Sequence, residues 1–132
     1  MRKRFFRSEK GQALVEFALC LPILLALLCG IIDFGWIYYN QITLNNAARE
    51  GARYAVIHYI PDSRQWHDDA IDLIHDSMVG VTAADAVVTN PENQQITAEV
   101  TAEAKILTGF TSTILGKNSV TLHAECTMRL EN

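Results

Sequence analysis

The sequence predicts an α+β protein in which one long N-terminal helix is followed by a shorter helix and a small antiparallel sheet. Three observations support this fold class. An apolar run near the N-terminus continues without a break into a stretch with helical periodicity, a second helical stretch follows, and the last third of the chain alternates apolar and polar residues. With 132 residues, the chain can form one small domain beyond the apolar run.

Charge is distributed unevenly along the chain. Residues 1–11 contain five basic residues and one acidic residue, a net charge of +4. Residues 12–132 contain 6 basic and 14 acidic residues, a net charge of −8. Because the basic residues cluster directly before an apolar run, they indicate membrane topology and argue against a nucleic-acid partner.

The 16 uncharged residues from Phe17 to Ile32 predict a membrane-spanning helix. Glu16 and Asp33, on either side of this run, would lie about 26 Å apart along a helix, close to the roughly 30 Å of hydrocarbon in a bilayer. We therefore predict a transmembrane segment at residues 12–39. A cleaved secretory signal peptide is the alternative, but no small-residue cleavage site follows the run.

Aromatic residues mark the outer end of this segment. Trp36, Tyr38 and Tyr39 follow Asp33, and we interpret all four as anchors at the membrane–water interface. Since the basic residues precede the run, we expect a cytoplasmic N-terminus and an external head formed by residues 40–132. The lipid bilayer is thus an expected partner.

The helical pattern continues beyond the membrane segment as far as Pro61. Apolar residues recur there at mainly three- and four-residue spacing, as on the buried face of an amphipathic helix. These residues are Phe34, Ile37, Ile42, Leu44, Ala48, Ala52, Ala55 and Tyr59. The pattern predicts a single helix of roughly 50 residues, half in lipid and half in the head.

A second, shorter helix is predicted for residues 62–80, with Asp62 or Ser63 as its N-cap and Gly80 at its end. An apolar stripe recurs every four residues. It consists of Trp66, Ala70, Ile74 and Met78.

The polar face of this second helix is rich in groups that can bind metals. It contains His67, Asp68, Asp69, Asp72, His75 and Asp76. We interpret them as a solvated surface, because no second segment offers ligands at a recognisable spacing. The chain also has no nucleophile elbow, phosphate-binding glycine loop or convincing pair of catalytic carboxylates. We therefore predict no catalytic residue, metal, cofactor or small-molecule substrate.

Period-two alternation predicts two long strands, at residues 95–105 and 119–130. A shorter strand is expected at residues 86–89, before a turn-rich segment. We expect the connection at residues 106–118 to be a loop with its own apolar residues. Since that loop can be drawn in more than one way, the order of the strands stays open.

Gly11 ends the basic leader, and Glu16 follows five residues later at the start of the hydrophobic helix. This combination resembles the type IV prepilin signal, which a membrane-embedded prepilin peptidase cleaves after the glycine. The resemblance implies a leader at residues 1–11, cleavage between Gly11 and Gln12, and Glu16 as the fifth mature residue.

An ionised Glu16 inside hydrocarbon costs roughly 2.5–3.5 kcal/mol on insertion scales and so needs a partner. By resemblance to pilins, we expect it to pair with the new amino group at Gln12 of a neighbouring subunit, which would set the axial register of the two helices. The alternative is that Glu16 only reaches the cytoplasmic headgroups, because it lies about one turn inside the membrane.

Two stretches in this order, "GQALVEFALCLPILLALLCGIIDFG" and "LNNAAREGARYA", resemble the TadE-like family of the tight-adherence (Tad, or Flp) pilus system. The resemblance implies a pseudopilin or minor pilin, with other pilin-like subunits and a prepilin peptidase as partners. Alternatives are a pseudopilin of type II secretion or DNA uptake, a membrane-anchored periplasmic enzyme, and a surface adhesin.

Small residues form a seam on the outer half of the long helix. The seam consists of Ala47, Ala48, Gly51, Ala52 and Ala55. Such a seam allows another backbone to approach closely. It could pack under the protein's own sheet, which we favour, or against the helix of a partner subunit.

Overall fold

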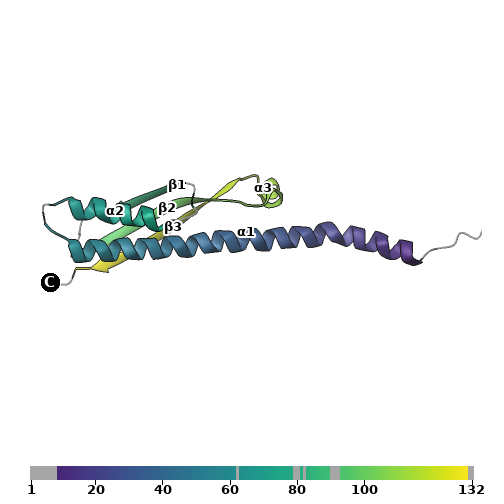
Figure 1. Cartoon of the computed structure of the whole chain (residues 1–132), viewed down its shortest axis with the longest axis horizontal. Coiled ribbons are helices and arrows are strands. Elements are labelled where there is room, and N and C mark those ends of the chain that lie inside the picture. The colour runs from purple at the N-terminus through teal and green to yellow at the C-terminus, as the bar shows by residue number, and fades with distance from the viewer. Residues whose placement is uncertain (1–8, 62, 79–80, 82, 90–92, 131–132) are drawn as a thin grey trace, which may run out of the picture.

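One helix, α1 (Glu9–His58), runs through the whole computed structural model and contains 50 residues. The structure describes residues 9–61, 63–78, 81, 83–89 and 93–130. The N-terminal half of α1 projects alone, and all other elements pack along its C-terminal half (Figure 1). The structure confirms the predicted single long helix and the α+β fold class. Most of the predicted leader lies outside the described residues.

The face of α1 that the head covers begins at Asp33 and recurs every three or four residues. Its fully buried residues are Asp33, Asn40, Leu44, Ala47, Ala48, Gly51, Ala52 and Ala55. The sequence interpretation was wrong for Phe34 and Ile42, whose side chains are 70% and 42% exposed. The carboxylate of Asp33 is satisfied on the buried face by hydrogen bonds. Asn40 Nδ2 donates a 2.8 Å hydrogen bond to the carbonyl oxygen of Trp36, whereas its buried Oδ1 has no hydrogen-bond partner among the described residues.

The sheet contains three antiparallel strands in the order β1–β2–β3: β1 (Ala83–Val88), β2 (Gln95–Lys105) and β3 (Ser119–Arg129). Both long strands agree with the predicted ranges to within one residue. β1 begins three residues earlier than predicted, because pairing with β2 extends it through Ala83 and Ala84. The strand order left open by the sequence is therefore a simple meander.

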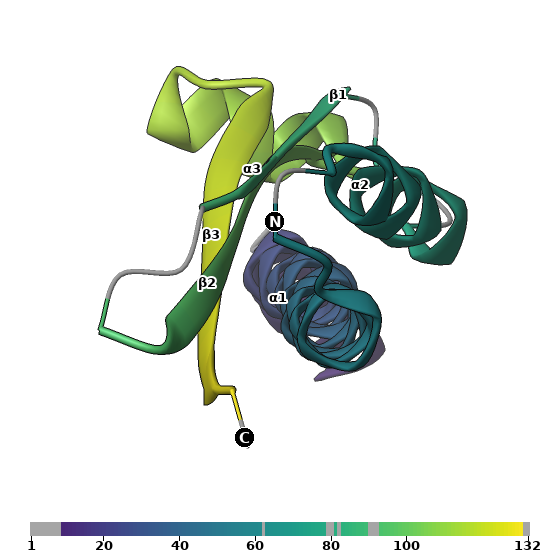
Figure 2. The same cartoon turned by 90° about the vertical axis from the view of Figure 1, so that its left-hand side faces the viewer.

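One face of the sheet packs against the helices, and the other is open (Figure 2). On β2, every second residue from Ile96 to Ala104 is buried. Val100 of β2 lies opposite Ala86 of β1 and Ala124 of β3, so the buried rows of the three strands coincide. The alternating pattern is thus satisfied by one layer of helices on one side of the sheet.

The second helix, α2 (Gln65–Ser77), packs beside α1 with Trp66, Ala70 and Ile74 buried. Its N-cap is Arg64, which makes no side-chain capping bond, so Ser63 is not the cap that we predicted. Ser63 Oγ instead accepts a 3.4 Å hydrogen bond from the backbone N–H of Gln65. The alternative cap Asp62 and the predicted terminator Gly80 lie outside the described residues.

The connection between β2 and β3 contains a short helix, α3 (Gly109–Leu115), where the sequence predicted a loop. Thr108 is its N-cap, and Gly116 ends it in a left-handed conformation (φ 66°), which glycine adopts without strain. Seven residues give too little periodicity to distinguish a helix from an apolar loop. Figure 1 shows α3 as the part of the head that reaches furthest towards the N-terminal half of α1.

Candidate functional site

The N-terminal half of α1 is an uncovered apolar surface. Its 18-residue window of highest hydropathy has a mean of 2.6, and none of it is buried within the chain. Leu14, Phe17 and Leu19 are 62–70% exposed. In water such a surface would be strongly unfavourable, since each large apolar side chain gains about 1.5–3 kcal/mol when it is buried. By length and composition, this helix is compatible with a single-pass membrane anchor.

Glu16 and Gln12 lie on the same side of α1, one turn apart. The side-chain amide of Gln12 donates a 3.3 Å hydrogen bond to Oε1 of Glu16, and both side chains are exposed. The predicted processing site, between Gly11 and Gln12, falls within the first turn of α1. The carboxylate of Glu16 therefore lies next to the side chain of Gln12. Cleavage after Gly11 would give Gln12 a free amino group.

Asp33 is buried against the β2–β3 connection, although we had interpreted it as an anchor facing the membrane surface. Its carboxylate accepts hydrogen bonds from the backbone N–H of Leu107 (3.1 Å), the backbone N–H of Thr108 (2.9 Å) and the hydroxyl of Thr108. The side chain is 2% exposed. We call this contact the Asp33 clasp. Sequence reasoning missed it because the partners are 74 and 75 residues away.

The other three predicted interfacial anchors lie on α1 beside the clasp. Tyr38 and Tyr39 are 59% and 55% exposed, and Trp36 is partly buried. Trp36 stacks on Tyr39 with ring centroids 6.1 Å apart, and Phe34 stacks on Tyr38 at 6.2 Å. This level of α1 therefore has a belt of aromatic rings on its uncovered sides.

The small-residue seam faces the interior of the head. Its four alanines are at most 1% exposed, and they pack under the sheet and beside α2. A Cβ atom at Gly51 would lie only 2.4 Å from Cδ1 and Cγ1 of Ile74 on α2. Of the two interpretations of the seam, the structure thus shows packing within the chain.

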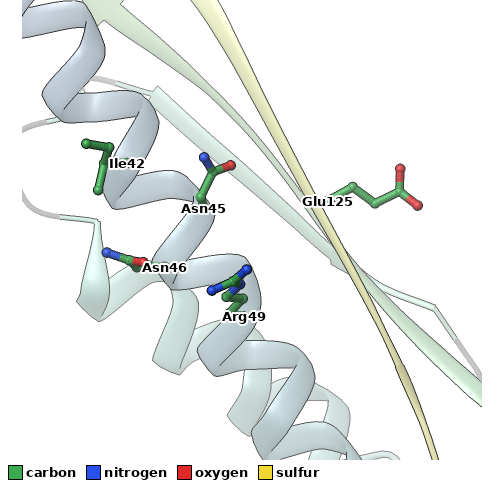
Figure 3. Close-up of a pocket in the computed structure, with 5 residues that line it drawn as sticks. All are labelled: Ile42, Asn45, Asn46, Arg49 and Glu125. Atoms are coloured by element: carbon green, nitrogen blue, oxygen red, sulfur yellow. The ribbon is translucent and has the colours of Figure 1, made fainter.

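A shallow polar groove lies where α1 passes the outer edge of β3 (Figure 3). It is lined by Ile42, Asn45, Asn46 and Arg49 of α1 and by Glu125 of β3. Next to it, Gln41 Nε2 donates a 2.8 Å hydrogen bond to the carbonyl oxygen of His123 and so holds the strand edge to α1. We did not predict this groove, because its two sides come from distant segments.

Arg49 is the charged residue of this groove on the α1 side. Within the part of the chain that the structure describes, its guanidinium forms no ion pair or hydrogen bond. The Glu125 side chain points away from it (Figure 3). The groove therefore offers a free cation and two amide side chains, a surface that suits a polar or acidic partner better than an apolar ligand.

The acidic face of α2 is exposed, as predicted. Among the described residues, no group of three or more histidine, cysteine, aspartate or glutamate side chains is arranged to hold a metal ion. On this face His67 Nδ1 lies 3.4 Å from Asp68 Oδ1, and the hydroxyl of Tyr54 on α1 donates a 3.4 Å hydrogen bond to Asp69 Oδ2.

Together, these features define a class of protein: an α+β head carried by one continuous helix whose free half is compatible with a membrane anchor. Residues 11–53 match the family model described as TadE-like protein. This segment is therefore similar to TadE-like proteins, as the sequence indicated, and the similarity is consistent with a TadE-like pilin of the Tad pilus system. No curated protein and no solved structure matches the chain.

The matched segment includes most of both halves of α1. It begins at the predicted processing site and ends between Gly51 and Ala55 of the buried seam. It therefore includes the apolar anchor, Asp33 and the groove residues of α1, while α2 and the sheet lie beyond it. This family supplies structural parts of a pilus and is not a family of enzymes.

Proposed function

We propose that the protein is a pseudopilin or minor pilin that takes part in assembly of a Tad pilus. The observation that supports this most is the division of α1. The TadE-like segment spans both an uncovered apolar half and a half on which the head is built. A subunit of this kind inserts with its N-terminus in the cytoplasm and its head, residues 40–132, outside, and it associates with other subunits through α1.

Maturation would begin with removal of residues 1–11 by a prepilin peptidase. The bond after Gly11 lies close to the N-terminal end of α1 as described, which begins at Glu9. Helix ends fray, so little structure must open for a protease to reach this bond. The product has a new amino group at Gln12.

Pairing of Glu16 with this amino group would then connect subunits. An isolated carboxylate in hydrocarbon is costly, and an ammonium group at the right height offsets that cost. In a subunit that stands alone, Glu16 has the Gln12 amide as its neighbour. A charged partner from an adjacent subunit would replace this neutral contact and fix the relative height of the two helices.

The uncovered side of α1 continues as an exposed row into the head. Phe34, Tyr38 and Ile42 are 70%, 59% and 42% exposed and lie four residues apart. The row leads to the groove at Asn45 and Arg49. A neighbouring subunit that packs along α1 would cover this row, whereas the seam is already occupied by α2.

Processing is tested by N-terminal sequencing of protein produced with and without a prepilin peptidase. We expect Gln12 as the first residue only when the peptidase is present. Gly11→Val should block this cleavage, and Gly35→Ala, at a site where a Cβ meets no atom within 4 Å, should not. Retention of residues 1–11 in the presence of an active peptidase would contradict the proposal.

Charge pairing is tested by co-purification with the other pilin-like subunits of the same system. Glu16→Ala and Glu16→Gln should both insert in the membrane and should both recover much less of the partner subunits. Glu103→Gln, on the open face of the sheet, is the matched control. Equal recovery for all four proteins, the wild type included, would show that Glu16 only reaches the headgroups.

A further inference from the structure

The tip of the β2–β3 connection exposes apolar side chains at one particular level of the molecule. Leu107 and Ile114 are 56% and 69% exposed. They lie at the two ends of the segment that contains α3, which extends from the sheet towards the N-terminal half of α1 (Figure 1). Exposure of two large apolar side chains to water is unfavourable, because burial of such side chains stabilises a protein.

The Asp33 clasp determines the height of this tip along α1. Asp33 is the first charged residue after the 16 uncharged residues, so it marks the outer end of the apolar run. Two backbone N–H groups and one hydroxyl of the tip bind directly to its carboxylate. One turn earlier on the same face of α1, Cys29 and Gly30 are half-buried, while Ile31 and Ile32 are exposed. The tip therefore lies beside the end of the apolar run.

The charge of the tip differs from that of the rest of the head. Residues 106–118 contain one basic residue, Lys117, and no acidic residue. The open face of the sheet, by contrast, carries Glu99, Glu103 and Glu125. An element with exposed apolar side chains, a nearby lysine and no acid suits the interface of a bilayer that contains anionic lipids.

We propose that the α3 tip is a second membrane contact, which inserts Leu107 and Ile114 into the interfacial region of the outer leaflet beside α1. The partner is the lipid surface. This inference depends on the transmembrane placement of α1 in the proposed function, and it is independent of the pilus role. The clasp explains how Asp33 is tolerated at this level: the tip supplies the donors that its carboxylate needs.

A consequence concerns the orientation of the head. With α1 alone as anchor, the head could rotate about the axis of the helix and tilt with it. A second contact on one side of α1 presents a defined face of the head to neighbouring subunits, including the groove at Asn45 and Arg49.

The test uses the full chain, with Cys20, Cys29 and Cys126 replaced by serine and with one new cysteine at a time. An environment-sensitive fluorophore is attached at Ile114→Cys, at Leu24→Cys in the apolar run, or at Asp72→Cys on the exposed face of α2. Each protein is reconstituted at a low protein-to-lipid ratio in vesicles of phosphatidylcholine and phosphatidylglycerol. Quenching by nitroxide groups attached near the headgroup or deep in the acyl chain is then measured.

We expect the Ile114 probe to be quenched several-fold more than the Asp72 probe by the shallow nitroxide, and the Leu24 probe to be quenched by the deep one. If the Leu24 probe is quenched while the Ile114 probe behaves like the Asp72 probe, the tip does not contact lipid and the inference is wrong. If the Leu24 probe is also not quenched, the transmembrane placement itself fails. An Ile114 probe that no nitroxide lipid quenches, and whose emission changes only when other pilin-like subunits are added, would assign the tip to a protein partner and would overturn the inference.

Discussion

The carboxylate of Asp33 accepts hydrogen bonds from the backbone N–H groups of Leu107 and Thr108 and so joins the midpoint of α1 to the tip of the sheet. At this point on α1 the uncovered half ends and the face that packs against the sheet and its connections begins. One acidic side chain therefore has two roles. It closes the apolar run in the sequence, and it holds a distant segment at that level in the structure.

Loss of the clasp should loosen the tip. We expect Asp33→Ala to lower the free energy of unfolding in detergent micelles by about 1–3 kcal/mol, because hydrogen bonds to a charged acceptor are lost and two N–H groups lose their partner. Hydrogen exchange at the Leu107 and Thr108 amides should accelerate. Asp72→Ala, at an exposed site on α2, should stay within about 0.5 kcal/mol of the wild type. Unchanged exchange at both amides would show that the clasp does not hold the tip.

The contact between Gly51 and Ile74 should make this glycine intolerant of substitution. In Gly51→Ala the new methyl group must displace Ile74, which is fully buried. Overpacking of this kind costs about 1–3 kcal/mol and exceeds or cancels the gain of about 1 kcal/mol from better helix propensity. Gly35→Ala has the same propensity gain without a clash and should not destabilise the protein.

A second substitution tests the mechanism of that effect. Ile74→Val removes Cδ1, one of the two atoms that the new Cβ would meet. The double variant Gly51→Ala/Ile74→Val should therefore be more stable than the sum of the two single effects predicts, as measured by thermal unfolding. Strict additivity would mean that the two positions are not coupled and that the seam tolerates a wider residue.

Alkaline pH should destabilise the head through Tyr54. Burial, the negative charge of Asp69 and the hydrogen bond to that carboxylate raise the pKa of the Tyr54 phenol above its usual value of 10.0. Since the folded state holds this proton more tightly than the unfolded state, the associated stability is present below pH 10 and declines as the pH rises from there towards the folded-state pKa. The ring also stacks on His58, with centroids 4.0 Å apart.

This decline is measured by unfolding at a series of pH values above 10, for the wild type and for Tyr54→Phe. The variant has no proton to lose at this position, so its stability should fall less steeply. Tyr38→Phe, which removes a hydroxyl from an exposed tyrosine, should retain the wild-type slope. Identical slopes for the wild type and Tyr54→Phe would assign the pH dependence to other groups.

Two glutamates on the open face of the sheet should repel each other. Glu99 of β2 lies directly opposite Glu125 of β3, and both are exposed. His123 Nδ1 approaches Glu99 to 3.7 Å and offers it a partial partner. Since like charges in this position are unfavourable, Glu125→Gln should stabilise the protein by about 0.2–1 kcal/mol.

Salt provides the control for this prediction. The difference between the wild type and Glu125→Gln should shrink in 1 M salt, where charges are screened within about 3 Å. Glu103→Gln changes a glutamate that faces Thr121 across the same pair of strands, and it should give no comparable gain. A gain for Glu125→Gln that persists at high salt would point to packing instead of charge.

The residue pattern by itself determined the elements with long, regular periods. The apolar run and the three- and four-residue spacing after it predicted one helix ending near Pro61, and period-two alternation predicted β2 and β3 to within one residue. Each of these signals is local, because it depends only on which faces of a helix or strand neighbouring residues occupy. The match to the TadE-like family likewise falls on the N-terminal segment with these regular patterns.

The tertiary structure alone decided which segments meet. The pairing of Asp33 with the tip, the packing of Gly51 against Ile74 and the groove beside Glu125 all join residues far apart in the chain. The burial of Asn40 and the exposure of Ile42 likewise depend on the side of α1 from which the sheet approaches. The residue pattern of a helix does not show from which side another element packs against it. Only the arrangement of the other elements around α1 determines which of its faces is buried.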